Sequence, residues 1–110
     1  MDSFAREALL YDFYGELLNE QQKRIFVAYA MEDQSLGEIA SLYGISRQAV
    51  SGMLHRCRTA LQEYEKKLGL IAKFDEMKDS ARKIHQIAEK LDCPEARQIE
   101  KLTEEMTEAF

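Results

Sequence analysis

The side chains of this chain that are best suited to recognise a ligand are concentrated between residues 47 and 58. On one face of a helix, at helical spacing, they are Arg47, Gln48, Ser51, His55 and Arg58, with Arg56 beside them. Arginine can pair bidentately with guanine and glutamine with adenine, while serine and histidine can meet phosphates or base edges. We expect Arg47, Gln48 and Ser51, at the amino-terminal end, to read bases, because that end of a recognition helix reaches furthest into the groove. Arg56 and Arg58 lie further along, where contact with phosphate is expected. The pattern predicts contact with double-stranded DNA.

Gly52 lies within the same helix, where glycine costs about 0.5 to 1 kcal/mol relative to alanine. Close approach of another backbone, or of a DNA strand, would explain it. The alternative interpretation of the whole face is ordinary solvated surface, and it stays open.

The segment 36–53 has the spacing of a helix-turn-helix, which would hold this face outward. Ala40 is small enough for two helices to cross there, and Gly44, four residues later, can take the positive φ of the turn. Ser46 is a candidate N-cap. The residues Ser35 and Glu38 form a capping box for the preceding helix. We expect the core of the motif to consist of Ile39, Ala40, Gly44, Ile45, Val50 and Leu54.

The composition predicts an all-α fold in one domain. The 110 residues are 45% hydrophobic and include one proline and five glycines. We expect a single helical domain, residues 1–110, with the helix-turn-helix at about 35–67 and dimerisation helices at about 70–110. No apolar run approaches the roughly 18 residues of a membrane span, and the first residues carry acids rather than the bases of a signal peptide. We therefore expect a soluble, cytoplasmic protein.

The predicted helices alternate with short capping signals. The first should run from about Ser3 to Leu18, and Asn19 and Gln22 form a weaker capping box for the second. Two apolar stripes at heptad-like spacing follow, over residues 50–68 and 70–91, and Gly69 lies between them. We expect these two helices to fold back on one another as a hairpin. A last acidic helix carries the apolar residues Ile99, Leu102, Met106 and Phe110.

The stripe over residues 50–68 is best explained by packing within the chain. Two residues beside the second stripe, Ile71 and Ile87, suggest an apolar face left over for a second copy. A homodimer is predicted.

The net charge of −5 weighs against nucleic acid, because phosphate binding needs positive charge. The distribution of the charge along the chain makes this argument weaker. Residues 36–61 hold three bases and one acid, for a net +2, so the remainder carries −7. The basic patch is local and weak.

No pattern of catalytic or metal-binding residues is present. Cys57 and Cys93 have neither the spacing of a zinc or redox site nor the density of a disulfide scaffold, and Cys57 reads as a core residue. His55 and His85 have no acid spaced to orient them, and His85 reads as a half-exposed surface histidine. There is no phosphate-binding loop and no hydrolase motif. We expect no enzyme activity, no metal and no cofactor.

The passage IASLYGISRQAVSGMLHRCRTALQEYEKKL, residues 39–68, resembles region four of bacterial sigma factors, whose last helix-turn-helix reads the −35 promoter element. The start of this motif falls on Ser46, Arg47 and Val50, and the resemblance puts Gln48, Ser51 and Gly52 at groove-facing positions. The chain departs from it at Ser51 and Gly52, where sigma factors usually place larger polar or basic residues.

Over nearly its whole length, including LLYDFYGELLNEQQKRIFVAYAMEDQSLGEIA, the chain is similar to the small YlxM family of Gram-positive bacteria. That resemblance implies a helix-turn-helix protein with a role near the signal recognition particle and its protein-targeting GTPase. Two hypotheses follow. The first is a dimeric DNA-binding regulator connected with that pathway. The alternative is a module that keeps the fold but binds protein, or the particle's RNA, through its acidic and apolar outer helices.

Overall fold

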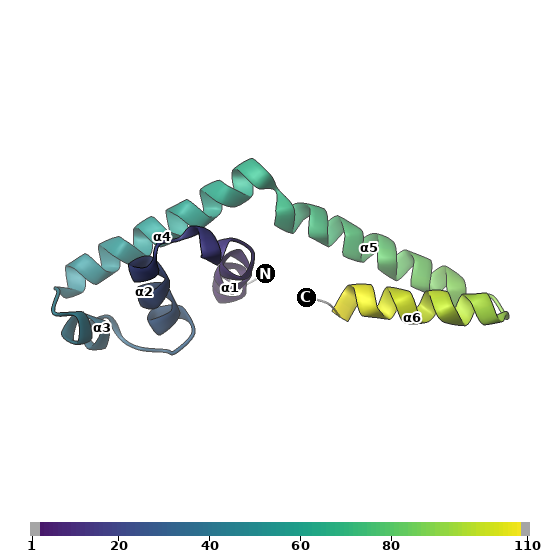
Figure 1. Ribbon diagram of the computed structural model, residues 1–110, viewed down its shortest axis with the longest axis horizontal. Coiled ribbons are helices and arrows are strands. Elements are labelled where there is room, and N and C mark those ends of the chain that lie inside the picture. The colour runs from purple at the N-terminus through teal and green to yellow at the C-terminus, as the bar shows by residue number, and fades with distance from the viewer. Residues whose placement is uncertain (1–2, 109–110) are drawn as a thin grey trace. The chain divides into compact units, whose positions relative to one another are not determined.

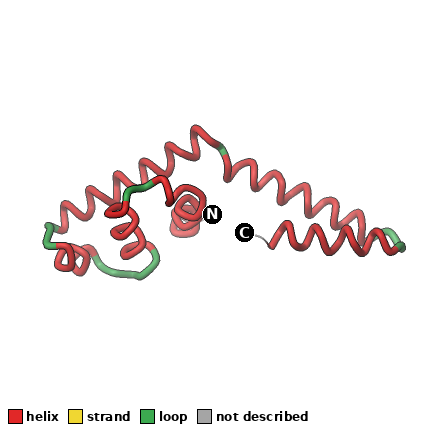
Figure 2. Tube along the Cα trace, in the orientation of Figure 1, coloured by secondary structure: helices red, strands yellow, loops and turns green. Residues whose placement is uncertain are grey.

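The computed structural model describes residues 3–108, which form six α-helices and one 3₁₀ helix and contain no strand. In chain order these are α1 (Ser3–Tyr14), η1 (Gly15–Leu17), α2 (Glu20–Ala30), α3 (Leu36–Tyr43), α4 (Arg47–Leu68), α5 (Leu70–Glu89) and α6 (Pro94–Glu108). Short turns join them (Figure 2). The all-α prediction is confirmed. None of the described helices is both long and apolar enough to cross a bilayer. Phe110, predicted to extend the last apolar stripe, lies outside the described residues.

The chain divides into two compact units, Met1–Ile71 and Ala72–Phe110. A single domain, as predicted, requires that the two units unfold together. This stays a prediction. Gly69 ends α4 in the left-handed conformation, with φ +63°, and α5 begins at the next residue. The expected fold-back of the helices on either side of Gly69 also stays a prediction.

Helix α4 is the central element of the first unit, and α1, α2 and α3 all pack along it (Figure 1). Its buried face consists of Val50, Leu54, Cys57 and Leu61, spaced four and three residues apart. None of these four is more than 2% exposed. This stripe packs within the chain, and Cys57 is a core residue, as the sequence predicts. Burial raises the pKa of the Cys57 thiol above its ordinary value.

The first helix is shorter than predicted. It ends at Tyr14, and residues Gly15–Leu17 form a 3₁₀ turn. Gly15 is buried so closely that an added Cβ would stand 2.9 Å from the Tyr11 ring. Leu18 is then extended, with ψ 154°. This places Asn19 to cap α2. The Asn19 side chain accepts from the backbone N–H of Gln22 at 2.8 Å, and the Gln22 side chain accepts from the backbone N–H of Asn19 at 3.0 Å.

A buried polar contact that the sequence analysis missed anchors the start of α5. The hydroxyl of Tyr14, a residue only 1% exposed, donates to Oε1 of Glu65 at 2.5 Å. The same hydroxyl accepts from the backbone N–H of Leu70 at 3.1 Å, and Glu65 Oε1 accepts from the N–H of Ile71 at 3.0 Å. Two amides of the first turn of α5 are thereby satisfied, as a helix amino terminus requires.

The predicted role of Ile71 at a dimer face is wrong. Its side chain is 1% exposed and belongs to the core of the first unit, together with Tyr14 and Leu61. The hydrogen bond from the N–H of Ile71 to Oε1 of Glu65 helps to hold it there. Ile87, its predicted companion, is 61% exposed.

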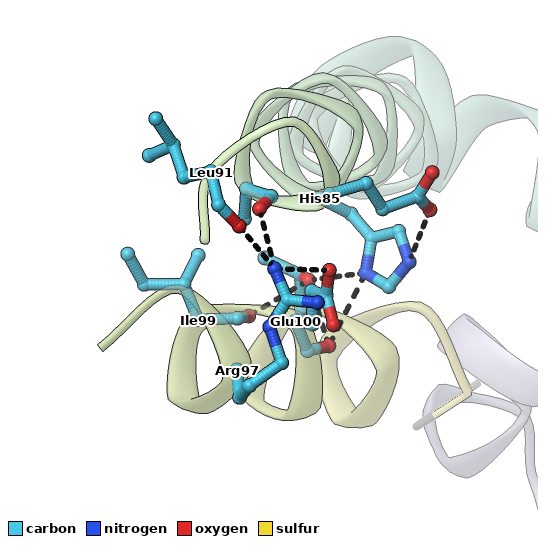
Figure 3. Close-up of polar contacts among 8 residues, drawn as sticks. His85, Leu91, Arg97, Ile99 and Glu100 are labelled. Atoms are coloured by element: carbon cyan, nitrogen blue, oxygen red, sulfur yellow. Dashed lines mark hydrogen bonds and ion pairs between the residues drawn. The ribbon is translucent and has the colours of Figure 1, made fainter. Parts of the chain in front are cut away.

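The second unit is a hairpin in which α5 and α6 lie side by side (Figure 1). Small side chains fill the seam between them: Ala81, Ala88, Ala96 and Thr103 are buried. At the end of α5, Arg97 of α6 donates from Nη2 to the carbonyls of Ala88 at 3.0 Å and Leu91 at 2.5 Å (Figure 3). The Ala88 carbonyl also accepts from the N–H of Leu91 at 3.1 Å, so Arg97 ties α6 to the turn that ends α5.

His85 bridges this seam (Figure 3). Its Nδ1 lies 2.9 Å from Oγ1 of Thr103 and 3.2 Å from the carbonyl oxygen of Glu100, both on α6. Its Nε2 lies 2.8 Å from the carboxylate of Glu89, one turn further along α5. The expectation that no acid is spaced to orient His85 is wrong, because Glu89 follows it by four residues, one turn of helix. The histidine fixes the level at which the two helices face each other.

Candidate nucleic-acid interface

The turn between α3 and α4 is fixed by local hydrogen bonds. Gly44 ends α3 with φ +66°, and Ile45 donates its N–H to the carbonyl of Ala40 at 3.0 Å. The hydroxyl of Ser46 then accepts from the N–H of Ala49 at 3.0 Å and starts α4. Val50 is fully buried and Ile45 half-buried in the same core, at the two positions of a hydrophobic staple, before and after the Ser46 cap.

The start of α3 is capped in the same way. The Ser35 hydroxyl accepts from the N–H of Glu38 at 3.1 Å, and the Glu38 carboxylate accepts from the N–H of Ser35 at 3.0 Å. The bond from the Ser35 backbone is the main cause that lowers the pKa of Glu38. Ile39 and Ala40 are buried behind this cap, and Leu54 is buried on α4. Both helices of the motif therefore begin at the residues that the sequence indicates.

The amino-terminal half of α4 presents a polar face to solvent. The exposed residues include five of the predicted contact residues, Arg47, Gln48, Ser51, His55 and Arg56. They point away from the buried stripe because about 100° separates successive residues in a helix. The structure thus brings these five side chains onto the accessible surface of one helix.

Arg47 also contacts the first helix of the motif. A Cβ added at Gly37 would stand 3.0 Å from Nη2 of Arg47, so the guanidinium lies directly over this glycine. Arg47 and Gly37 line one shallow depression together with Ser35, Ser41 and Leu42. The absence of a side chain at position 37 allows Arg47 to lie against α3 while it remains exposed.

Arg58 is the exception, and its predicted position on the open face needs correction. Its Nε lies 2.6 Å from Oε1 of Glu7, and its guanidinium stands 5.7 Å from the centre of the Tyr29 ring. The side chain of Arg58 is 34% exposed, and that of Glu7 is 20% exposed. Helix α1 reaches α4 at this level, so Arg58 pairs within the chain and is not offered to a ligand as a free cation.

The space over Gly52 is open. An added Cβ would meet only Nη1 of Arg56, at 3.6 Å, among the described atoms outside its own stretch of helix. No other backbone of the described chain approaches this glycine, which removes one of the two explanations that the sequence suggested for it.

Charge on the first unit is nearly balanced. Residues 1–71 contain eight bases and ten acids. Arg47 and Arg56 are exposed on the face of α4, and Lys66 and Lys67 are exposed in its last turn. Residues 3–108 contain no cluster of histidine, cysteine and acidic side chains that could hold a metal ion. The exposed face of α4 therefore carries both polar and cationic groups.

Comparison with known proteins agrees with this geometry. Residues 1–106 match a family described as "Putative helix-turn-helix protein, YlxM / p13 like". The chain belongs to this family. Among its YlxM/p13-like relatives, a UPF0122 protein of Symbiobacterium thermophilum is 53% identical over 72 residues, which cover 66% of this chain and 67% of the relative. The UPF0122 protein YlxM of Bacillus subtilis is 41% identical over 88 residues, which cover 80% of each chain.

Proposed function

We propose that this protein is a non-enzymatic, cytoplasmic regulator that binds double-stranded DNA as a homodimer through the exposed face of α4. The observation that carries the proposal is the polar amino-terminal half of α4, held outward by a capped helix-turn-helix and left uncovered by α1. A helix with such a face can enter the major groove, where its first residues meet base edges.

Roles within the interface follow from position. Arg47, Gln48 and Ser51 read bases, while His55 and Arg56 lie further along and approach the backbone. Arg58 supports the interface by its bond to Glu7, which ties α1 to α4. The open space over Gly52 lets a DNA strand pass close to the helix.

A homodimer strengthens the proposal, because one helix with few cations binds duplex weakly and two helices reach two half-sites. The connection with the signal recognition particle pathway rests on the family resemblance. On that basis we propose that the regulated genes, or a direct partner, are connected with the targeting GTPase. The alternative function, a module that binds protein or the particle's RNA without reading DNA, is the competing outcome of the experiment below.

Selection from a randomised duplex library tests the proposal. We expect enrichment of a two-fold symmetric sequence at about 50 mM salt, with much weaker binding at about 200 mM. Arg47→Ala should cost about 1 to 3 kcal/mol at the selected site and relax its base preference. Arg47→Lys is the matched control: it keeps the charge and the salt dependence but loses bidentate pairing.

Arg56→Ala should weaken all duplexes alike and reduce the slope of log affinity against log salt by about one. If no duplex is enriched at low salt, or if the position 47 and 56 variants bind as the wild type does, DNA reading fails. Capture of the particle's RNA or its GTPase by the same protein would then support the interaction module.

A further inference from the structure

One face of the α5–α6 hairpin is apolar and exposed. On α5 it contains Met77 and Ile84, which are 58% and 46% exposed, and Leu91, 50% exposed, continues the seven-residue spacing in the turn after α5. On α6 it contains Ile99, Leu102 and Met106, which are 38%, 58% and 45% exposed. Met77, Ile84 and Met106 line one shallow groove, so the two stripes lie on the same side of the hairpin. We call these six residues the hairpin face.

The hairpin holds its large apolar side chains outside its own seam. Three alanines and a threonine fill that seam and bury little area. A segment as short as residues 72–110 cannot bury enough apolar surface to be stable as two helices alone. The hairpin face therefore needs a further layer against it.

The size of the hairpin face suits a protein partner. Six side chains that are about half exposed leave on the order of 500 Å² of apolar surface, which is in the upper part of the range of about 300 to 600 Å² for the largest apolar patch of a monomer, a patch that is often functional. It is also more than half of the roughly 800 Å² per partner of standard interfaces. Flanking side chains such as Ile87, also exposed, would add to it.

The symmetry of the hairpin face identifies the partner. Because His85 contacts Thr103, the neighbouring residues Ile84 and Leu102 lie at the same level of the two helices. Met77 and Leu91 are each seven residues from Ile84, and Ile99 and Met106 are three and four residues from Leu102. If a two-fold axis crosses the hairpin face at this level, the apolar residues of one copy pack against apolar residues of the other. Such self-complementarity is what an isologous dimer interface requires.

We infer that the hairpin face is the interface with a second copy of this chain, packed with α5 antiparallel to its counterpart and with Ile84 close to the two-fold axis. This inference rests on the homodimer of the proposed function and names its interface. It replaces the dimer face first expected from Ile71, and it does not depend on DNA binding.

Light scattering on the full chain gives the first test. The wild type should have about twice the mass of the 12.7 kDa chain. Ile84→Glu and Leu102→Glu should each yield the monomer mass at the same protein concentration, with helical circular dichroism retained. Leu42→Glu is the matched control, since Leu42 is an exposed leucine on α3, 67% exposed against 58% for Leu102, and it should remain dimeric.

Cross-linking gives a second test that does not depend on disrupting the fold. In a Cys93→Ser background, needed because Cys93 is exposed, Ile84→Cys should form an intermolecular disulfide under mild oxidation. Gln86→Cys, exposed on the same helix but outside the hairpin face, should not.

The outcomes separate the two proposals. A wild type that is monomeric at high concentration overturns both the interface and the homodimer, and assigns the hairpin face to a different partner. A dimer that persists in Ile84→Glu and does not cross-link through position 84 overturns only the interface. Loss of DNA binding with the dimer intact leaves this inference standing and refutes the proposed function.

Discussion

Removing the hydroxyl of Tyr14 should destabilise the first unit although the aromatic ring stays in place. In Tyr14→Phe, Glu65 loses a hydrogen bond from a neutral donor to its carboxylate, and the N–H of Leu70 loses its acceptor. A hydrogen bond to a charged group contributes about 1.5 to 3 kcal/mol, and the N–H of Leu70 costs less than the about 1 to 3 kcal/mol of a buried unsatisfied donor, because Leu70 is 45% exposed. Partial relaxation limits the sum, so we expect a loss of about 2 to 4 kcal/mol.

Urea denaturation followed by circular dichroism measures this loss. With a slope of about 2 kcal/mol per molar urea, the middle of the usual range, the midpoint should fall by about 1 to 2 M. Tyr64→Phe is the matched control: its ring lies 6.1 Å from that of Tyr14, it is half-buried, and its hydroxyl makes no hydrogen bond among the described residues. Equal midpoints for the two variants would refute the role given to the Tyr14 hydroxyl.

The same contact predicts a pH dependence. Burial first, and then the hydrogen bond to Glu65, raise the pKa of Tyr14 above its ordinary value near 10. The folded state thus holds this proton more tightly than the unfolded state. Its contribution is complete below about pH 10 and is lost as the pH rises through the folded-state pKa. The stability difference between wild type and Tyr14→Phe should therefore shrink above pH 10, and a constant difference would contradict the assignment.

Four further positions give predictions that denaturation measurements can check. Ala40→Leu should cost about 1 to 3 kcal/mol through overpacking at a position only 7% exposed, and an unchanged midpoint would mean that the helices do not cross there. Gly44→Ala should cost about 1 to 2 kcal/mol, because φ is +66° while nothing lies within 4 Å of an added Cβ. Ile71→Ala should cost about 2 to 5 kcal/mol as a core truncation, whereas a variant that changes only the molecular mass would restore the original dimer hypothesis. The lowered pKa of Glu38 means that its contribution is present above about pH 4.5 and is lost as the pH falls through the folded-state value. Glu38→Gln should therefore flatten the acid limb of the stability curve, and an unaltered limb would argue against the capping role.

The helix boundaries of the recognition motif were determined by the sequence alone. Ser35 with Glu38, and Ser46 with Ala49, interact within one turn of helix, so residue type and spacing are sufficient to predict the bonds. The same is true of Gly44, whose left-handed conformation depends on its missing side chain. The buried stripe of α4 also follows from periodicity. These local rules predicted the fold class and five of the six candidate contact residues as exposed.

What only the tertiary structure decided were the contacts between elements distant in the chain. By its position in the helical repeat, Arg58 belongs to the open face of α4. It nevertheless pairs with Glu7, 51 residues earlier, because α1 packs against α4 at that level. Tyr14 and Glu65 are also 51 residues apart in the chain. Glu65 in turn accepts from the N–H of Ile71, whose side chain is buried in the core. Periodicity indicates which side of a helix is apolar, but it does not specify which helix covers that side or where its coverage ends. The packing of whole helices sets those limits, and with them the extent of the surface left free on α4 and on the hairpin.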